Sequence, residues 1–452
     1  MRPLFMFTLI LTQLLAYGQE WVPSDQNEIV IQSVTIIPMD SERIIENQTV
    51  VIKEGIISAM GSAPAFSKQA LIIDGKGKYL IPGLAEMHAH VPPRDDLEAQ
   101  TEVLNLFSYA GITTIRGMLG HPSHLKLRTL MNEGKVIGPR FFTTGPSLNG
   151  ISITSPEMGE QTVRNQKAAG YDYLKLHPGL SKDKFASIAG TANAIGIPFV
   201  GHVSFGVGVW TAIDSGYSSI DHLDGFVQGM VPGIEKMTDQ DAGLFGVFVA
   251  DQADRSKLPQ LMDALKKQNV WVVPTQALAD RWFSPDFDHG AFRKGPTSKY
   301  MDSKTLDQWE AAKKNFVSNE HYDADAIRRY IRLRRELILA CQETGVGLLL
   351  GCDAPQVFNV PGFSTHEELE YLVKSGLTPY QALQTGTVNV GKYLGINNLG
   401  QVKEGFIADL ILLEKNPLEN ITNSKTISGV MMRGSWISKE QIAIGYKKLE
   451  KE

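Results

Sequence analysis

The sequence predicts an α/β protein built around a (β/α)8 barrel. Across the middle of the 452-residue chain, short apolar runs alternate with helical patterns, which is typical of β-α-β units with buried parallel strands. Eight such units favour closure into a TIM barrel. An open doubly wound sheet is the alternative, but no glycine-rich phosphate turn follows the first run. The eight runs are Leu80–Met87, Ile112–Arg116, Arg140–Thr144, Asp172–Leu176, Pro198–Val203, Ser219–Leu223, Val270–Pro274 and Gly347–Asp353.

Helical patterns occupy most of the intervals between these runs. Residues 98–110, 123–133, 162–169 and 325–344 are examples. Two intervals, from Leu223 to Val270 and from Thr275 to Gly347, are much longer than the others. Long loops after the strands of a barrel usually shape its substrate pocket, so we expect that role here; extra packed helices are the alternative.

Both ends of the chain have β patterns. Residues 28–83 contain strand-like runs and a hairpin signal at Lys53-Glu-Gly55. Residues 402–413 and 430–434 contain similar strand-like runs. We expect these ends to form one small β-sandwich, although two unrelated β segments packed on the barrel would give the same pattern. The predicted divisions are a signal peptide at 1–18, a composite β-sandwich from 19–82 and 398–452, and a barrel at 83–397.

The N-terminus is typical of a secretory signal. Arg2 is followed by a mostly apolar run from Leu4 to Leu15 and by small residues around Ala16-Tyr-Gly18. A retained anchor or a buried first helix is the alternative. No other apolar stretch is long enough to cross a bilayer, so the sequence predicts a soluble protein that is secreted or periplasmic.

Composition narrows the function classes further. The formal net charge of −5 disfavours a general nucleic-acid binder. The two cysteines, Cys341 and Cys352, lie in a predicted helix and a predicted buried strand. Two buried free thiols fit this placement better than one disulfide. The oligomeric state stays open, and a homo-oligomer is compatible with the sequence.

The chemistry-bearing residues gather at the predicted strand ends. His88 and His90 are one residue apart in an extended segment, so both imidazoles point to the same side and can reach one metal ion. Barrel active sites lie at the carboxyl ends of the strands. Further metal-capable side chains end later runs: Lys175, His202, His222 and Asp353.

These motifs resemble the amidohydrolase superfamily over nearly the whole chain after the signal. The segment Ile81-Pro-Gly-Leu-Ala-Glu-Met-His-Ala-His90 is similar to the first-strand metal motif of the family, and Gly201-His-Val, Ile220-Asp-His-Leu and Gly351-Cys-Asp-Ala follow in the family's order. The imidazolonepropionase-related branch, which includes prolidase-like peptidases, is the most similar. Many prolidase-like relatives carry a Gly-Gly-His-like stretch where this chain has Asn149-Gly-Ile-Ser.

The resemblance implies a centre with two divalent ions, with zinc as the expected metal. His88, His90 and Asp353 would bind one ion, and His202 and His222 would bind the other. Lys175 would bridge the ions as a carbamate, which replaces a cation with an anion that offers one oxygen to each metal. An unmodified Lys175 would instead leave a mononuclear site.

The implied reaction is hydrolysis of an amide-type carbon–nitrogen bond by a metal-bridging hydroxide. Asp353 would move the proton to the leaving nitrogen, and His177 and Arg116 are candidate substrate contacts. N-acyl amino acids or small dipeptides are the expected small-molecule substrates. A lactone or organophosphate ester hydrolase is the alternative on the same site. A deaminase fits less well, and a metal-free binding barrel is disfavoured by the full ligand set.

Overall fold

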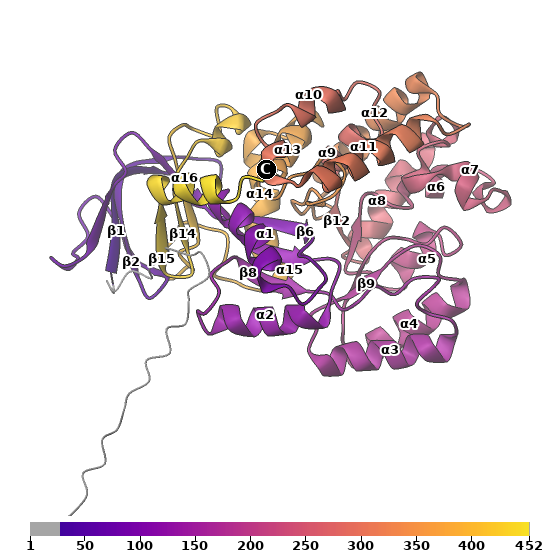
Figure 1. Ribbon diagram of the computed structural model, residues 1–452, viewed down its shortest axis with the longest axis horizontal. Coiled ribbons are helices and arrows are strands. Elements are labelled where there is room, and N and C mark those ends of the chain that lie inside the picture. Colours follow the sequence, from indigo (N-terminus) through magenta and orange to yellow (C-terminus); the bar gives the residue numbers. More distant parts are fainter. Residues whose placement is uncertain (1–27, 452) are drawn as a thin grey trace, which may run out of the picture.

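The computed structural model describes residues 28–451. Figure 1 shows strands from both chain ends gathered on one side of the molecule and the helix-rich middle of the chain on the other. The predicted signal peptide at residues 1–18 lies outside the described residues. In the described part, no helix is long and apolar enough to cross a membrane.

Strands from both ends of the chain share one eight-stranded sheet. Its order is β15-β14-β13-β5-β1-β2-β3, with β4 also paired to β1. The central contact between the two ends is antiparallel, with Ile411 of β13 opposite Ile81 of β5. The strands are β1 Glu28–Ile36, β2 Ile45–Lys53, β3 Ile56–Gly61, β4 Leu71–Asp74, β5 Tyr79–Pro82, β13 Leu410–Leu413, β14 Ile427–Met432 and β15 Ser435–Ser438.

The predicted hairpin at Lys53-Glu-Gly55 is confirmed. Glu54 and Gly55 both have positive φ, 50° and 74°, as a two-residue turn between twisted antiparallel strands requires. The turn sets the register of β2 against β3, which begins with Lys53 opposite Ile56.

Strand β13 separates two hydrophobic cores. Leu410 and Leu412 belong to the core of the mixed sheet, with Ile29, Ile31 and the other buried residues of that sheet. Ile411 and Leu413 point the other way, into the large core of the helix-rich part. Side chains alternate along a strand, so one short strand attaches the mixed sheet to the rest of the molecule.

The middle of the chain contains seven parallel strands in two sheets. The first sheet has the order β6-β7-β8 and the second β12-β11-β10-β9. Each strand coincides with one of the predicted apolar runs. They are β6 Leu84–Ala89, β7 Ile112–Gly117, β8 Arg140–Thr143, β9 Leu174–Leu176, β10 Phe199–Gly201, β11 Ser219–Asp221 and β12 Trp271–Val273.

The first predicted run, Leu80–Met87, is in fact two strands. It is interrupted at Gly83, whose N–H donates to the carbonyl of Asp409. The part before Gly83 is β5 of the mixed sheet, and the part after it is β6 of the parallel sheet. A Cβ at position 83 would lie 2.2 Å from Thr113 Oγ1, so only glycine lets the chain pass between the two sheets.

The eighth predicted run, Gly347–Asp353, is not a regular strand, but its backbone links the two parallel sheets. On one side, Val272 N donates to Gly347 O and Leu349 N donates to Val272 O. On the other side, Met87 N donates to Leu350 O. Isolated parallel bridges join Val272 to Leu348 and Ala89 to Ala354. The segment therefore lies between β12 and β6.

Helices follow most of the parallel strands, and those predicted from the sequence are present. Several begin with a side-chain cap, such as Asp96 before α1 and Ser155 before α3. The α-helices are α1 Leu97–Tyr109, α2 Pro122–Asn132, α3 Pro156–Ala169, α4 Lys182–Ile195, α5 Val209–Asp214, α6 Phe226–Met230, α7 Asp239–Ala242, α8 Leu258–Lys267, α9 Gln276–Trp282, α10 His289–Arg293, α11 Ser303–Val317, α12 Ala324–Thr344, α13 Phe363–Lys374, α14 Pro379–Gly386, α15 Val388–Leu394 and α16 Lys439–Lys448.

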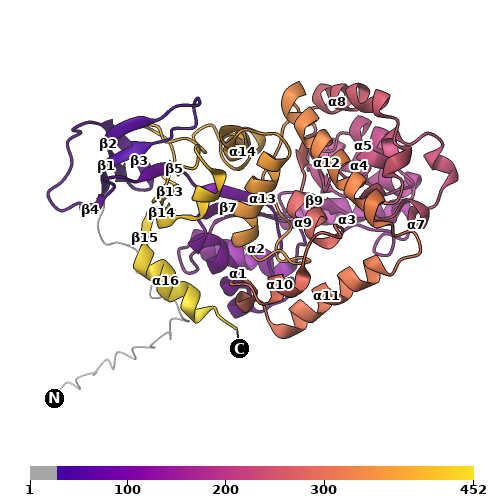
Figure 2. The same cartoon turned by 90° about the horizontal axis from the view of Figure 1, so that it is seen from above.

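The two long intervals are filled by helices rather than open loops. The first contains α6, α7 and α8, and the second contains α9 to α12. Figure 2 shows α11 ending near α7, so the two intervals meet in space. Both intervals therefore contribute to the same side of the molecule.

Candidate metal centre

The six side chains expected to bind metal lie together at the carboxyl ends of the parallel strands. His88 lies in β6, and His90 follows that strand directly; Lys175 lies in β9, His202 follows β10 and His222 follows β11. The ring centroid of His88 is 5.4 Å from that of His90 and 4.5 Å from that of His222. The rings of His202 and His222 are 4.6 Å apart.

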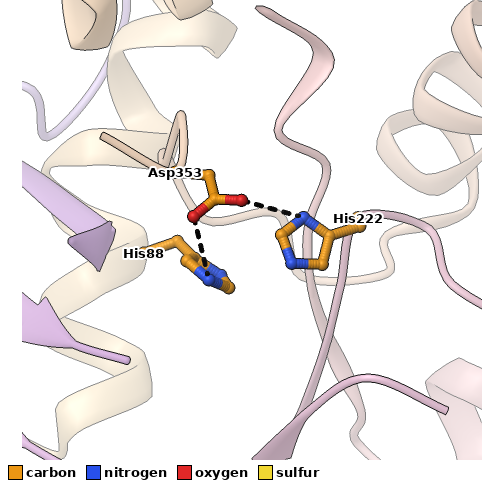
Figure 3. Close-up of side chains that lie close together, drawn as sticks. All are labelled: His88, His222 and Asp353. Carbon is orange, nitrogen blue, oxygen red and sulfur yellow. Dashed lines mark ion pairs between the residues drawn. The ribbon is translucent and has the colours of Figure 1, made fainter. Parts of the chain in front are cut away.

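Asp353 contacts three of the histidines. Its Oδ1 lies 2.5 Å from His90 Nε2 and 3.5 Å from His88 Nε2, and its Oδ2 lies 3.9 Å from His222 Nδ1. Figure 3 shows the carboxylate of Asp353 between the rings of His88 and His222. The same carboxylate can thus reach ions on both sides of it.

The residues present fit a metal centre. One ligand atom each from His88, His222 and Asp353 can be chosen so that all three lie within 4.8 Å of one another, and all three residues are buried. Lys175 is fully buried, with its Nζ 3.4 Å from His88 Nε2 and 3.7 Å from Asp221 Oδ2. Imidazole and carboxylate are the donors that zinc prefers.

Three residues that the sequence did not single out hold the histidine rings. Asp221 Oδ2 lies 3.0 Å from His88 Nδ1, His202 Nδ1 lies 3.0 Å from Asp224 Oδ2, and His222 Nδ1 lies 2.8 Å from Thr275 Oγ1. Such partners fix the orientation of a metal-binding imidazole and leave Nε2 available. Asp221 and Asp224 lie close to His222 in the segment Asp221-His-Leu-Asp224, and this proximity could have identified them from the sequence. No sequence feature pointed to Thr275.

Three of the histidines, His88, His202 and His222, are held in the neutral form that binds metal. Burial, more than any neighbouring charge, lowers the pKa of His88, His202 and His222 well below the ordinary value. Burial also lowers the pKa of Lys175 to about 8, against the opposing effect of Asp221 and Asp353. A buried lysine in this state gives up its proton more easily than a lysine in water.

The backbone is strained at two of the expected ligands. His222 has φ of 64° and Asp353 has φ of 68°, and Thr275 beside His222 has φ of 48°. Residues other than glycine adopt this left-handed region at a cost of about 1–3 kcal/mol, and such strain concentrates at functional sites. Here the strained residues are His222, directly after β11, and Asp353, at the end of the irregular segment 347–353.

The model of the amidohydrolase family matches residues 79–437, which is most of the chain. This chain belongs to the amidohydrolase family. The match confirms the superfamily predicted from the motifs, and the protein is accordingly a hydrolase.

Among curated proteins, the chain is similar to ochratoxinase of Aspergillus niger. The two are 22% identical over 435 residues, covering 87% of this chain and 82% of that protein. Adenine deaminase of Clostridium botulinum is 25% identical over 208 residues, but these cover only 41% of this chain and 33% of the deaminase.

Solved structures share the amidohydrolase fold. Bottromycin amidohydrolase has a TM-score of 0.71 at 20% identity, covering 94% of this chain and 91% of its own. A Xaa-Pro dipeptidase with bound methionine has a TM-score of 0.66 at 19% identity, covering 91% and 100%. At these identities the likeness establishes the fold alone.

The two candidate substrate contacts of this amidohydrolase have different surroundings. The ring of His177 stacks 4.8 Å from that of His202, and its Nδ1 contacts Ser147 Oγ, so His177 lies beside the cluster. Arg116 is fully buried and donates to Met87 O, Ser219 Oγ, Tyr393 OH and Asp221 Oδ1. The structure thus shows Arg116 in the buried salt bridge that supports Asp221.

Glu86 links the two segments that carry His88 and Asp353. Its Oε1 accepts from His88 N at 3.1 Å and from Cys352 N at 2.8 Å, and its Oε2 accepts from Thr365 Oγ1 and Cys352 Sγ. Burial raises the pKa of Glu86 to about 7. The sequence showed a glutamate in the metal motif but not this role, because its partners are far away along the chain.

Both cysteines are free and buried, which confirms the prediction. Cys341 lies against Met262 in the core, with its Sγ 3.7 Å from the methionine sulfur. Cys352 is the residue directly before Asp353 and belongs to the Glu86 network.

A cavity of about 550 Å³ lies beside the cluster and reaches the surface through the two long intervals. Asp224, which accepts from His202, is part of its wall, and so is Phe245. The ring of Phe245 stacks on the rings of His202 and His222 at 5.9 and 5.0 Å. The cavity and the cluster therefore share a wall, and the predicted role of the long intervals fits this geometry.

Proposed function

We propose that this amidohydrolase is an exported enzyme that uses two divalent metal ions, best matched by zinc, to hydrolyse an amide-type carbon–nitrogen bond. N-acyl amino acids or small dipeptides are the proposed substrates. The observation that carries the proposal is the cluster of six side chains at the strand ends, four of them buried and two, His90 and His202, partly buried: His88, His90, Lys175, His202, His222 and Asp353.

The proposed ligand assignment is the one that the resemblance to the family implies. His88, His90 and Asp353 would hold one ion, and His202 and His222 would hold the other. Support comes from Asp353, whose two oxygens face His90 and His222. Lys175 would join the ions as a carbamate; the position of its Nζ within 3.4 Å of His88 Nε2 supports this.

When bound, the ions would supply Lewis acidity at the substrate carbonyl and lower the pKa of a water. The chain's own residues do the rest. The Asp353 carboxylate takes up the proton of the attacking water and delivers it to the leaving nitrogen. Asp221, Asp224 and Thr275 keep the imidazole rings in place, and the Phe245 ring packs on the His202 and His222 rings.

The amide bond is favoured by the relatives. The family is named for amide hydrolysis, and two similar structures are called an amidohydrolase and a Xaa-Pro dipeptidase. Ochratoxinase matches most of this chain. The similarity to adenine deaminase covers a smaller part of both proteins.

Metal analysis and a substrate screen test the proposal together. The purified protein should contain close to two divalent ions per chain and should cleave N-acyl amino acids or Xaa-Pro dipeptides. Removing the ions with a chelator should abolish turnover, and zinc with bicarbonate should restore it. A protein that binds no metal and stays inactive after this addition would overturn the proposal. Cleavage confined to lactones or phosphotriesters would show that the enzyme is an ester hydrolase and not an amide hydrolase.

The proposal includes the fold around the site and the export of the protein. We propose that the seven parallel strands and the segment around Leu348 close into one barrel, which the bridges from that segment to both sheets support. We also propose that residues from both chain ends form a small β-sandwich. N-terminal sequencing of protein exported to a bacterial periplasm should find cleavage after about residue 18; an uncleaved chain would argue against export.

A further inference from the structure

The cavity beside the metal cluster has an aromatic wall. Six of the residues that line it are aromatic: Phe205, Phe245, Phe248, Trp282, Phe283 and Phe316. Five of these rings, all but that of Phe205, form a connected set, with Phe283 and Phe316 4.9 Å apart and Phe248 stacked on Phe316 at 5.7 Å. Flat apolar walls favour flat apolar ligands, since aromatic pairs contribute energy beyond the area they bury.

This wall extends from the cluster to the surface. Phe245 and Phe283 are buried, and the Phe245 ring stacks on two of the histidines. Phe316, near the end of α11, is only partly buried. The cavity therefore runs from the Phe245 ring, at the edge of the cluster, along the aromatic wall towards α11 and α7.

The mouth of the cavity is negatively charged. Asp239, Asp241 and Glu320 lie there and are exposed, and His321 is the neighbouring basic side chain. In the described part of the chain, the residues that line the cavity include no lysine or arginine. Asp224 adds a carboxylate deeper inside. An anionic group would lose its hydration here and meet like charges, so it would be excluded.

We propose that this cavity binds the acyl half of the substrate and that this half carries an aromatic ring and no negative charge. The inference rests on the proposed function, because the N-acyl amino acids and dipeptides proposed there end in a free carboxylate. That carboxylate belongs to the amine half, so the amine half lies outside the cavity. The volume of about 550 Å³ is ample for an aromatic acyl group.

Three amides of the same amino acid test the inference on the enzyme. The amino acid is the one cleaved fastest in the screen above, and the acyl groups are acetyl, phenylacetyl and 4-carboxyphenylacetyl. We expect kcat/KM for phenylacetyl to exceed that for acetyl by about tenfold or more, and the added carboxylate to cancel this gain. Equal kcat/KM for acetyl and phenylacetyl, or full tolerance of the carboxylate, would overturn the inference and leave the proposed function standing.

A matched pair of variants locates the effect in the cavity. Phe316→Ala removes part of the wall away from the cluster, whereas Phe292→Ala removes a partly buried ring that packs against Phe358 and Trp309 outside the cavity. Phe316→Ala should raise KM for the phenylacetyl substrate about tenfold and change acetyl turnover little. Equal effects of the two variants on both substrates would point to a merely structural role.

Binding measurements test the aromatic specificity of the cavity without relying on turnover. Calorimetry with 2-phenylethanol and 2-phenylethylamine should show binding to the purified protein, tighter for the cationic amine, and weakened in Phe316→Ala. Ethylamine, which lacks the ring, should not bind. If neither aromatic probe binds, the inference is overturned even if the enzyme cleaves amides. If the probes bind but no amide is cleaved by the metal-loaded protein, the proposed function fails and the aromatic cavity stands.

Discussion

In the proposed centre, the number of metal ions would depend on Lys175. It is fully buried in the cluster, where an unmodified ammonium would compete with two dications. Lys175→Ala should reduce the metal content to about one ion or fewer per chain and lower turnover by several orders of magnitude, because the bridge is lost. Elemental analysis and kinetics measure both effects, and short carboxylic acids should restore part of the activity.

Lys126→Ala, which removes an exposed lysine of α2, is the control and should behave as the native protein. Two ions and full activity in Lys175→Ala would exclude the bridging carbamate.

Glu86 offers a second test at the scale of one residue. Glu86→Ala leaves the backbone N–H groups of His88 and Cys352 without their acceptor, so the segments that carry His88 and Asp353 lose a shared anchor. We expect metal affinity to fall by about 10–100-fold. Glu86→Gln keeps a carbonyl oxygen for the two N–H groups and should recover much of the affinity. Competition with a chelator measures it; equal loss in both variants would contradict the anchoring role.

At the scale of elements, a buried carboxyl of α13 joins the start of α9. Glu368 accepts from Gln276 N at 2.8 Å and from Ala277 N at 2.6 Å. Burial raises the pKa of Glu368 to about 8, above its ordinary value of 4.5. The folded protein therefore binds this proton more tightly than the unfolded chain does. The resulting stabilisation is complete below pH 4.5 and is lost as the pH rises through 8.

Glu368→Gln removes this titration. Relative to the variant, the native protein should lose about 1 kcal/mol or more of unfolding free energy between pH 5 and pH 8. Urea unfolding at several pH values measures the difference. Glu343→Gln, at an exposed position of α12, should follow the native curve. A parallel pH dependence in native protein and Glu368→Gln would show that the carboxyl does not titrate in this range.

The elements show which parts of the site could be predicted. Strand-end positions predicted that the six side chains of the cluster lie near one another, because parallel strands bring their carboxyl ends together. Their roles as metal ligands stay a prediction from the family resemblance. Thr275 and Glu86 could not be found this way, since their roles depend on how separate segments pack. The irregular segment 347–353 was expected to be a strand because its apolar run looks like one, but only a few of its backbone groups pair.

At the scale of the whole molecule, β13 connects the mixed sheet to the metal-binding part. Ile411 is fully buried in the large core, so Ile411→Ala should cost about 2–5 kcal/mol of unfolding free energy. Ile444→Ala, where the side chain is 49% exposed, should change it by less than about 0.5 kcal/mol. Chemical denaturation measures both, and similar losses would show that β13 is not a packing element.

The overall arrangement was only partly accessible from the sequence. The β patterns at both ends predicted that these ends come together, and the structure places their strands in one sheet. The break at Gly83 was hidden within a continuous apolar run, because both halves of the run are buried strands. A change of sheet at one glycine leaves no trace in hydrophobic periodicity.

The position of β13 also has a consequence for the order of assembly during biosynthesis. Strand β5 leads through Gly83 directly into β6, which carries His88, and β5 is paired with β13, more than 300 residues later in the chain. During synthesis, β6 therefore leaves the ribosome long before β13, the partner strand of β5, has been made. The six residues of the cluster all precede β13 in the chain, so all of them are synthesised before β5 gains this partner strand.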